Sequence, residues 1–276
     1  MQYKRILTIQ DISCVGQCSM TVAMPILSAC GQECCVLPTA VLSTHTGGFG
    51  KPEIVHLTDS AERMWRHWQD QGISFDAILV GYLGSVRTIA MVERIVSAML
   101  VPGGLFILDP AMADHGKLYS GFDTDYVEAM KRLCCRADIL LPNLTEAALL
   151  TDNDYTDIID ENYVNNMIRK IGASRVVLTG VGYEENTTGV LIKDGENIVH
   201  YTHRKIGSAC HGTGDIFAAC FAGALMCGKK LDDAVKIAAE FTVLAIENTV
   251  KAPAHWYGVK FETAIPDLIR MLTELE

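Results

Sequence analysis

The residues best suited to chemistry lie in the stretch Cys210-His211-Gly212-Thr213-Gly214-Asp215, which runs directly into the apolar segment 216–222. Two glycines allow backbone N–H groups to approach an anion closely. The N-terminus of a following helix adds unpaired donors and a positive dipole end. A carboxylate at Asp215 can take the proton from an attacking hydroxyl group. Gly212, Thr213, Gly214 and Asp215 therefore predict the transfer of a phosphoryl group to an alcohol.

The same stretch also fits an ordinary helix start, because Asp is a good N-cap residue and Gly-Thr-Gly is a common turn. A second segment, from Gly223 to Lys230, nearly has the spacing of a P-loop. It lacks the final Ser or Thr and lies at the end of the predicted helix rather than after a strand. We interpret it as a helix C-terminus with Gly228 as the cap.

Composition narrows the classes of partner. The chain has 276 residues, 49% of them hydrophobic, and a net charge of −10 with no basic block, so a nucleic acid or a membrane surface is not an expected partner. No secretory signal is visible and no apolar run reaches the ~18 residues that span a bilayer, so we expect a cytoplasmic protein.

The ten cysteines lack zinc-site spacing, and we expect most of them to be buried thiols. Cys14 and Cys210 are the exceptions, since both lie near proposed site loops.

Short apolar runs alternate with helical patterns along the chain, which is typical of an α/β protein with a parallel sheet buried on both faces. A hairpin, residues 188–193 and 197–202 joined by Asp194-Gly195, adds an antiparallel ribbon. We expect one domain over residues 1–276, with a flap at about 41–56 and a nearly all-helical part after Asp215. Trp65 and Trp68 share a helix face, and core packing is their expected fate. The expected strands are 6–9, 77–80, 105–108, 139–141 and 176–178, and the expected helices are 19–30, 59–71, 87–100, 123–135, 144–151 and 161–172.

Polar side chains follow each of the predicted strands. In an open α/β sheet, ligands bind beyond the carboxyl ends of the strands, so these groups should meet at one edge. Carboxylates gathered there would hold Mg²⁺, which prefers oxygen ligands. Asn143 and Glu146 also fit a capping box, and this alternative stays open. The segments concerned begin at Gln10, Gly81, Asp109, Pro142 and Thr179.

These motifs resemble the ribokinase-like superfamily, and specifically the vitamin B6 kinases, over roughly residues 5 to 275. The most specific marks are Gly212 to Asp215, Asp109-Pro110, Pro142 to Glu146, Gly81 to Ser85, and Ser43 to Thr46. The resemblance implies a three-layer fold with a mostly parallel central sheet, helices on both faces and a small antiparallel hairpin. It also implies phosphorylation of the 5′-hydroxymethyl group of pyridoxal, pyridoxine or pyridoxamine with ATP and Mg²⁺, in a homodimer.

The resemblance assigns roles to individual residues. Asp215 matches the general base, and the amides around Gly212, Thr213 and Gly214 match the group that stabilises the transferred phosphoryl. The metal site is matched by Glu146, Asn143 and Asp109. The nucleotide site is matched by Asp109, Asn143, Thr179, Lys205 and, on a lid at about 110–123, Asp114 and Tyr119. The ring of the acceptor is matched by Thr46 and Tyr82. Asp11 stands where the chain departs from the pattern and can bind a ring nitrogen or hydroxyl group instead, with Ser13 as the fallback.

The chain departs from the B6-kinase pattern after the first strand, where many members carry a Ser-His pair and this sequence has Asp11-Ile12. Asp at this place is similar to the hydroxymethylpyrimidine kinases of the same superfamily, so a hydroxymethylpyrimidine kinase is the alternative. A sugar kinase is less favoured, because the chain lacks room for a large lid subdomain. A non-catalytic sensor that binds pyridoxal phosphate or a nucleotide is a third interpretation. A dinucleotide oxidoreductase ranks low, since no G-x-G-x-x-G follows the first strand. The preferred vitamer and any need for a monovalent cation such as K⁺ are left open.

Overall fold

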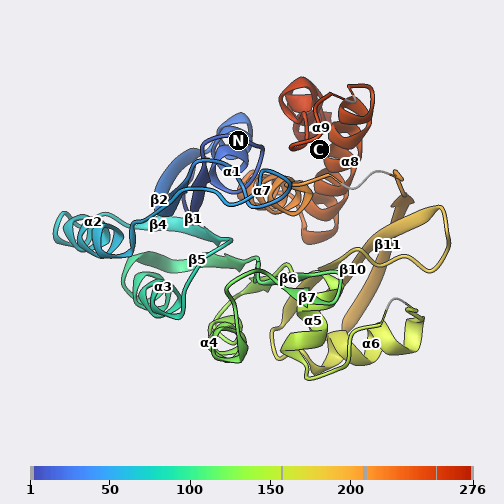
Figure 1. The fold of residues 1–276 in the computed structure, drawn as a ribbon, viewed down its shortest axis with the longest axis horizontal. Coiled ribbons are helices and arrows are strands. Elements are labelled where there is room, and N and C mark those ends of the chain that lie inside the picture. The colour runs from blue at the N-terminus through green and yellow to red at the C-terminus, as the bar shows by residue number, and fades with distance from the viewer. Residues whose placement is uncertain (1–2, 157, 208–209, 253, 275–276) are drawn as a thin grey trace.

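The protein is organised around a nine-stranded sheet with helices on both faces (Figure 1). The structure, a computed structural model, describes residues 3–156, 158–207, 210–252 and 254–274. The strand order is β11-β10-β9-β8-β5-β4-β1-β2-β3, and the pairs from β2 through β1, β4, β5 and β8 to β9 are all parallel. The α/β class and the mostly parallel sheet predicted from the sequence are confirmed.

The strands agree with the apolar runs of the sequence and extend beyond most of them. The predicted hairpin is present as an antiparallel pair, β10 and β11, with Asp194 opposite Asn197. A second, two-stranded sheet lies within the segment predicted to be a lid. The strands are β1 (Arg5–Ser13), β2 (Glu33–Leu42), β3 (Ile54–His56), β4 (Phe75–Val80), β5 (Leu100–Leu108), β6 (Ala113–Asp114), β7 (Lys117–Leu118), β8 (Ile139–Leu140), β9 (Arg175–Thr179), β10 (Thr187–Asp194) and β11 (Asn197–Arg204).

The helices begin and end within one or two residues of their predicted bounds. Helix α7 closes as predicted: Gly228 has a φ of 88°, its N–H donates to Leu225, and the N–H of Lys229 donates to Ala224. This is the Schellman pattern of a helix C-terminus. The helices are α1 (Met20–Ala29), α2 (Thr58–Asp70), α3 (Val86–Met99), α4 (Thr124–Cys134), α5 (Leu144–Leu150), α6 (Glu161–Lys170), α7 (Thr213–Met226), α8 (Leu231–Val250), a 3-10 turn (Glu262–Ala264) and α9 (Ile265–Glu274).

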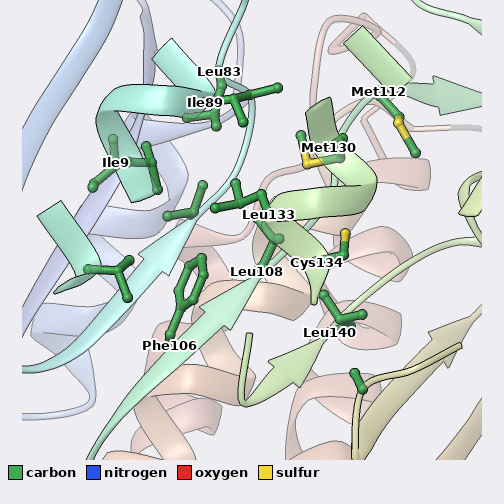
Figure 2. Close-up of a cluster of buried hydrophobic side chains, with 14 of the residues drawn as sticks. Ile9, Leu83, Ile89, Phe106, Leu108, Met112, Met130, Leu133, Cys134 and Leu140 are labelled. Carbon is green, nitrogen blue, oxygen red and sulfur yellow. The ribbon is translucent and has the colours of Figure 1, made fainter. Parts of the chain in front are cut away.

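Two hydrophobic cores lie on opposite faces of the sheet. Successive residues of a buried strand point to opposite faces, and in β5 this sends Phe106 and Leu108 to one core and Ile107 to the other. The first core is covered by α2 to α6, and Figure 2 shows Phe106 and Leu108 near Leu133 of α4. The second is covered by α1, α7, α8 and α9. Trp65 lies in the first core with 4% of its surface exposed, which confirms its predicted packing.

Four strands, β2, β3, β6 and β7, are missing from the sequence prediction, and β2 is the longest of them. Its neighbour β3 pairs only with Ala40 to Leu42, so the first part of β2 has a free edge. Pro38 is tolerated there because a proline needs no ladder partner at an edge. The predicted flap is shorter as a result: Val41 and Leu42 belong to β2, and the irregular segment covers residues 43–53.

Two further expectations need correction. The part after Asp215 is not nearly all helical, because residues 251–252 and 254–261 are irregular between α8 and the 3-10 turn; residues 253, 275 and 276 lie outside the described part. Most cysteines are not fully buried: none of the ten is in a disulfide, and only Cys30, Cys134 and Cys220 are buried. No helix in the described ranges is long and apolar enough to cross a membrane.

Candidate active site

A pocket of about 680 Å³ lies beyond the carboxyl ends of β1, β4, β5, β8 and β9. The chain passes from β1 to β2 on one side and then returns to β4 on the other, so the strand order reverses at β1. Such a reversal is where open α/β sheets bind ligands. All of the predicted site residues except Lys205 line this pocket. Lys205 follows β11, and its side chain is exposed outside the lining.

The glycine loop ends in the N-terminus of α7, as the sequence predicted. Gly212 occupies the N-cap position with a φ of 84°, a left-handed conformation that favours glycine. A Cβ atom at this residue would also overlap the backbone oxygen of Gln17. Asp215 is the third residue of the helix rather than its N-cap. The ordinary N-cap interpretation of Asp215 is therefore wrong, and its carboxylate is free to face the pocket.

Asp215 has the electrostatic setting of a base. Burial raises its pKa to about 7, opposed by the backbone N–H of Ser19 and reinforced by the nearby charge of Asp11. A general base works best when its pKa lies near the working pH. The position of Asp215 in the first turn of α7 also places it beside unpaired helix donors, where an anion is stabilised.

A second acidic group is formed by Asp109 and Glu146. Burial and the charge of Glu146 raise the pKa of Asp109, and burial raises the pKa of Glu146 to about 8. Asp109 follows β5, whose neighbour β8 leads into α5 and Glu146. Two carboxylates brought together in a buried site disfavour the charged forms of each other. A cation bound between Asp109 and Glu146 would instead stabilise the charged forms of both.

Asn143 and Glu146 form the capping box that was one of the two interpretations of their spacing. The Asn143 side chain accepts from the Glu146 N–H at 2.9 Å, and the Asn143 N–H donates to Glu146 Oε2 at 2.9 Å. Glu146 Oε1 also accepts from the N–H of Met112 at 3.1 Å. The pair therefore joins the start of α5 to the predicted lid. The capping box gives Asn143 and Glu146 a structural role. It does not prevent Glu146 from binding a metal ion as well, since a carboxylate has further lone pairs.

The donor set fits Mg²⁺ held with the help of a substrate. Among the described residues, no group of three or more His, Cys, Asp or Glu side chains could enclose a metal ion by itself. Mg²⁺ is commonly bound by one or two carboxylates together with water and the phosphates of a nucleotide. Asp109 and Glu146 supply such a pair.

The end of the pocket that is predicted to bind the acceptor is built around Asp11. Strand β1 continues past the predicted strand end, and its register with β2 shifts between Gln10 and Ile12. Such a bulge redirects side chains. Asp11 and Ser13 lie two residues apart on one face, and Ser13 Oγ donates to Asp11 Oδ2 at 3.2 Å. Burial raises the pKa of Asp11, whose residue is 4% exposed.

Tyr82 and Thr46 line the same pocket as Asp11 from the ends of β4 and β2. Tyr82 stacks on Phe122 with ring centroids 5.3 Å apart, which fixes the orientation of its ring. Thr46 is exposed on the segment between β2 and β3. Asp11, Ser13, Thr46 and Tyr82 thus present one carboxylate, three hydroxyl groups and one aromatic ring to the pocket, which suits a small polar heterocycle.

His45 fastens the 43–53 segment to the segment after α8. Its Nδ1 atom accepts from the N–H of Gly47 at 3.0 Å, and its Nε2 atom lies 2.7 Å from the oxygen of Tyr257 and donates to it. The neighbouring Phe49 packs against Trp256 with ring centroids 4.7 Å apart. These contacts give His45 a structural role.

The end of the pocket that is predicted to bind the nucleotide contains the β6–β7 hairpin and the ends of two strands. Asp114 lies on β6, and Tyr119 follows β7 with its N–H donated to Met112 at 2.9 Å. Thr179 ends β9 beside Asn143, with which it forms a parallel bridge. These polar groups therefore lie around the same opening as Asp109.

Sequence reasoning missed an apolar part of the pocket wall and several contacts between loops. Ala239, Thr242, Val243 and Ile246 of α8 line the pocket at helical spacing, and this stripe was readable in the sequence as one face of a helix. Ser19, His211 and the contact between His45 and Tyr257 carried no local signal, because they depend on loops that meet only in the fold.

The fold is that of a ribokinase-like kinase. The chain belongs to the phosphomethylpyrimidine kinase family, which matches residues 27–259. This family and its B6-kinase relatives are phosphotransferases that act on alcohol groups. The predicted membership is confirmed.

Similar proteins include both kinds of kinase weighed from the sequence. A hydroxymethylpyrimidine/phosphomethylpyrimidine kinase from Haemophilus influenzae is 31% identical over 176 residues, which cover 61% of this chain and 64% of that protein. The structure of pyridoxal kinase from Lactobacillus plantarum has a TM-score of 0.89 and 32% identity, with 97% of both chains covered. A Bacteroides thetaiotaomicron protein in a crystal form with pyridoxal has a TM-score of 0.91 and 33% identity, with 96% of this chain and 95% of that chain covered. The chain spans 64 to 66% of the length of the first curated relatives that it matches.

Proposed function

We propose that this protein is an ATP-dependent kinase that phosphorylates the 5′-hydroxymethyl group of pyridoxal, pyridoxine and pyridoxamine. The observation that carries the proposal is Asp215, a carboxylate with a pKa of about 7 in the first turn of α7, directly after the left-handed Gly212. The similarity to the Lactobacillus plantarum pyridoxal kinase over nearly the full chain supports the choice of acceptor.

Asp215 acts on the hydroxyl group of the acceptor. Its carboxylate takes the hydroxyl proton while the acceptor oxygen forms a bond to the γ-phosphorus, and the bond from that phosphorus to the β,γ-bridging oxygen breaks to release ADP. The backbone N–H groups at the start of α7 face the charge that spreads over the transferred phosphoryl group. Because these donors are fixed in a helix terminus, they need no rearrangement as the charge moves.

Asp109 and Glu146 would hold Mg²⁺, which neutralises charge on the phosphates of the nucleotide. Other polar residues would surround these phosphates: Asp114 and Tyr119 from the lid, and Asn143 and Thr179 from the strand ends. The expected homodimer and the expected cytoplasmic location stay predictions.

A hydroxymethylpyrimidine kinase is the second candidate, and Asp11 is the observation that favours it. A buried carboxylate can bind the amino group of an aminopyrimidine as well as a polar edge of a pyridine ring. The Haemophilus influenzae relative adds weight to this alternative. A non-catalytic sensor is the third candidate. A sensor needs no general base, so this candidate does not account for the energetic cost of burying Asp215.

The test is phosphorylation of a panel of acceptors with ATP and Mg²⁺, comparing the wild type with Asp215→Asn. The panel contains the three B6 vitamers and hydroxymethylpyrimidine. We expect turnover of the vitamers in the wild type and a loss of 10²- to 10⁴-fold in the variant, the usual contribution of a general base. Turnover of the pyrimidine alone would favour the second candidate. Ligand binding without turnover would favour the sensor.

A further inference from the structure

The backbone of Ser19 has an unusual conformation. Its φ is 53° and its ψ is −126°, which a residue with a side chain adopts rarely and at a cost. The chain just before Ser19 is held on two sides. Ser19 forms an antiparallel bridge with Ile12, and the backbone of Gln17 lies so close to Gly212 that a Cβ atom there would overlap its oxygen. The strained backbone therefore lies between β1 and the glycine loop, where the surrounding chain can maintain it.

The side chain of Ser19 does not cap helix α1, although its position suggests that it should. It is the N-cap residue of α1, and serine is among the preferred N-cap residues because its oxygen accepts from the helix N–H groups. The side chain makes no such bond here. Ser85 at the N-cap of α3 does, and its oxygen accepts from the Thr88 N–H at 3.2 Å. The hydroxyl group of Ser19 is therefore available for another contact.

The polar groups of Ser19 contact two carboxylates instead. Its hydroxyl group interacts with Asp11, and its backbone N–H interacts with Asp215; each interaction opposes the rise that burial imposes on the pKa of that carboxylate. Ser19 itself is 7% exposed and lines the pocket. One residue thus joins the group that faces the acceptor ring to the group that faces the reacting hydroxyl.

We propose that Ser19 is a positioning residue that fixes Asp11 and Asp215 relative to each other and so sets the fit of the acceptor. This inference deepens the proposed function and rests on it. The acceptor must present its ring to Asp11 and its hydroxymethyl group to Asp215 at the same time. A residue that holds both carboxylates fixes the spacing between these two contacts, and pre-organisation of this kind improves affinity without a new contact to the ligand.

The experiment uses Ser19→Ala and Ser19→Gly. Both variants remove the hydroxyl group and keep the backbone N–H, and glycine also relieves the positive φ. We expect both to raise the Kd for pyridoxine about 10-fold, since a hydrogen bond to a charged group is lost. The KM for ATP and the kcat at saturating acceptor should change by less than about 3-fold, because the N–H to Asp215 remains. Ser19→Gly should be at least as heat-stable as the wild type.

Two controls separate positioning from a purely structural role. In an Asp11→Ala background, Ser19→Ala should have almost no further effect on the Kd, because its partner is gone. Ser85→Ala, which removes a true helix cap, should lower the Tm and leave the Kd unchanged. An unchanged Kd in both Ser19 variants, or an equal weakening with and without Asp11, would overturn the inference.

The binding measurement also separates this inference from the proposed function. If the wild type binds pyridoxine without phosphorylating it, the kinase proposal fails, and the Kd values still decide the role of Ser19. If the wild type binds none of the acceptors, both proposals are overturned together.

Discussion

Replacement of Asp215 by Asn should raise the stability of the protein while abolishing its activity. The carboxylate lies at the wall of the pocket, largely removed from solvent, and its pKa is raised from 3.8 to about 7. A carboxyl group with a raised pKa binds protons more tightly in the folded state than in the unfolded state. Between pH 4 and pH 7 the wild type therefore loses stability as the pH rises, and the loss is complete above pH 7. The amide introduced by Asp215→Asn does not titrate, so the variant avoids this loss.

The magnitude follows from the size of the shift. A rise of about 3 pKa units corresponds to a ceiling of about 4 kcal/mol. The side chain is partly accessible through the pocket, so screening by solvent reduces this figure to about 2 kcal/mol. For a protein of this size, 2 kcal/mol corresponds to an increase in Tm of about 4–8 °C. The increase should be present at pH 8 and absent near pH 4.

The assay is thermal unfolding of the wild type and Asp215→Asn at pH 4.5 and at pH 8, without nucleotide or Mg²⁺, paired with acceptor turnover at pH 8. Asp70→Asn, which changes an exposed carboxylate at the end of α2, is the control and should leave both curves nearly unchanged. A variant that is less stable than the wild type at pH 8, or equally shifted at both pH values, refutes the argument from burial. Retained turnover refutes the assignment of the base.

Three further predictions concern the same site. The kcat/KM for the acceptor should rise with unit slope as the pH rises and level off near pH 7, because only the ionised Asp215 accepts a proton; a flat wild-type profile from pH 5 to 8 contradicts this. Gly212→Ala should reduce kcat/KM at least 100-fold and lower the Tm, whereas Gly72→Ala, at a positive φ with open space around it, should cost only about 1 kcal/mol of stability. Glu146→Gln should raise the Mg²⁺ concentration for half-maximal turnover about 10-fold, measured by Mg²⁺ titration beside the exposed control Glu128→Gln; equal titration curves would remove Glu146 from the metal site.

The buried strands could be predicted well because a parallel sheet covered on both faces needs continuous apolar runs. Ile6 to Ile9 and Ala77 to Val80 illustrate this, since both runs feed the two cores alternately. Strand β2 was harder to find, because its Pro38 is tolerated only through the free edge left by the short β3. That edge depends on the pairing of distant segments, which a local pattern does not encode.

The site could be predicted where each residue follows a strand or begins a helix. Asp109, Asn143 and Asp215 meet because the topology brings strand ends to one edge. Lys205 illustrates the limit: proximity to the glycine loop in sequence did not bring it into the pocket. Ser19 could not be recognised, because its role depends on a strained backbone and on two carboxylates from different elements.

If the protein is a kinase of the proposed kind, we expect the choice between a pyridine and a pyrimidine acceptor to depend on the protonation of Asp11, because the phosphoryl-transfer groups would serve either ring equally. Burial raises the pKa of Asp11, while Ser13 and Ser19 donate hydrogen bonds that stabilise its charged form. An ionised Asp11 accepts only, so it favours a ring that presents an N–H, an amino group or a hydroxyl group. A neutral Asp11 can instead donate to an unprotonated ring nitrogen. The ring that binds therefore selects the ionisation state, and the two serines bias that selection toward acceptors with a donor at this edge.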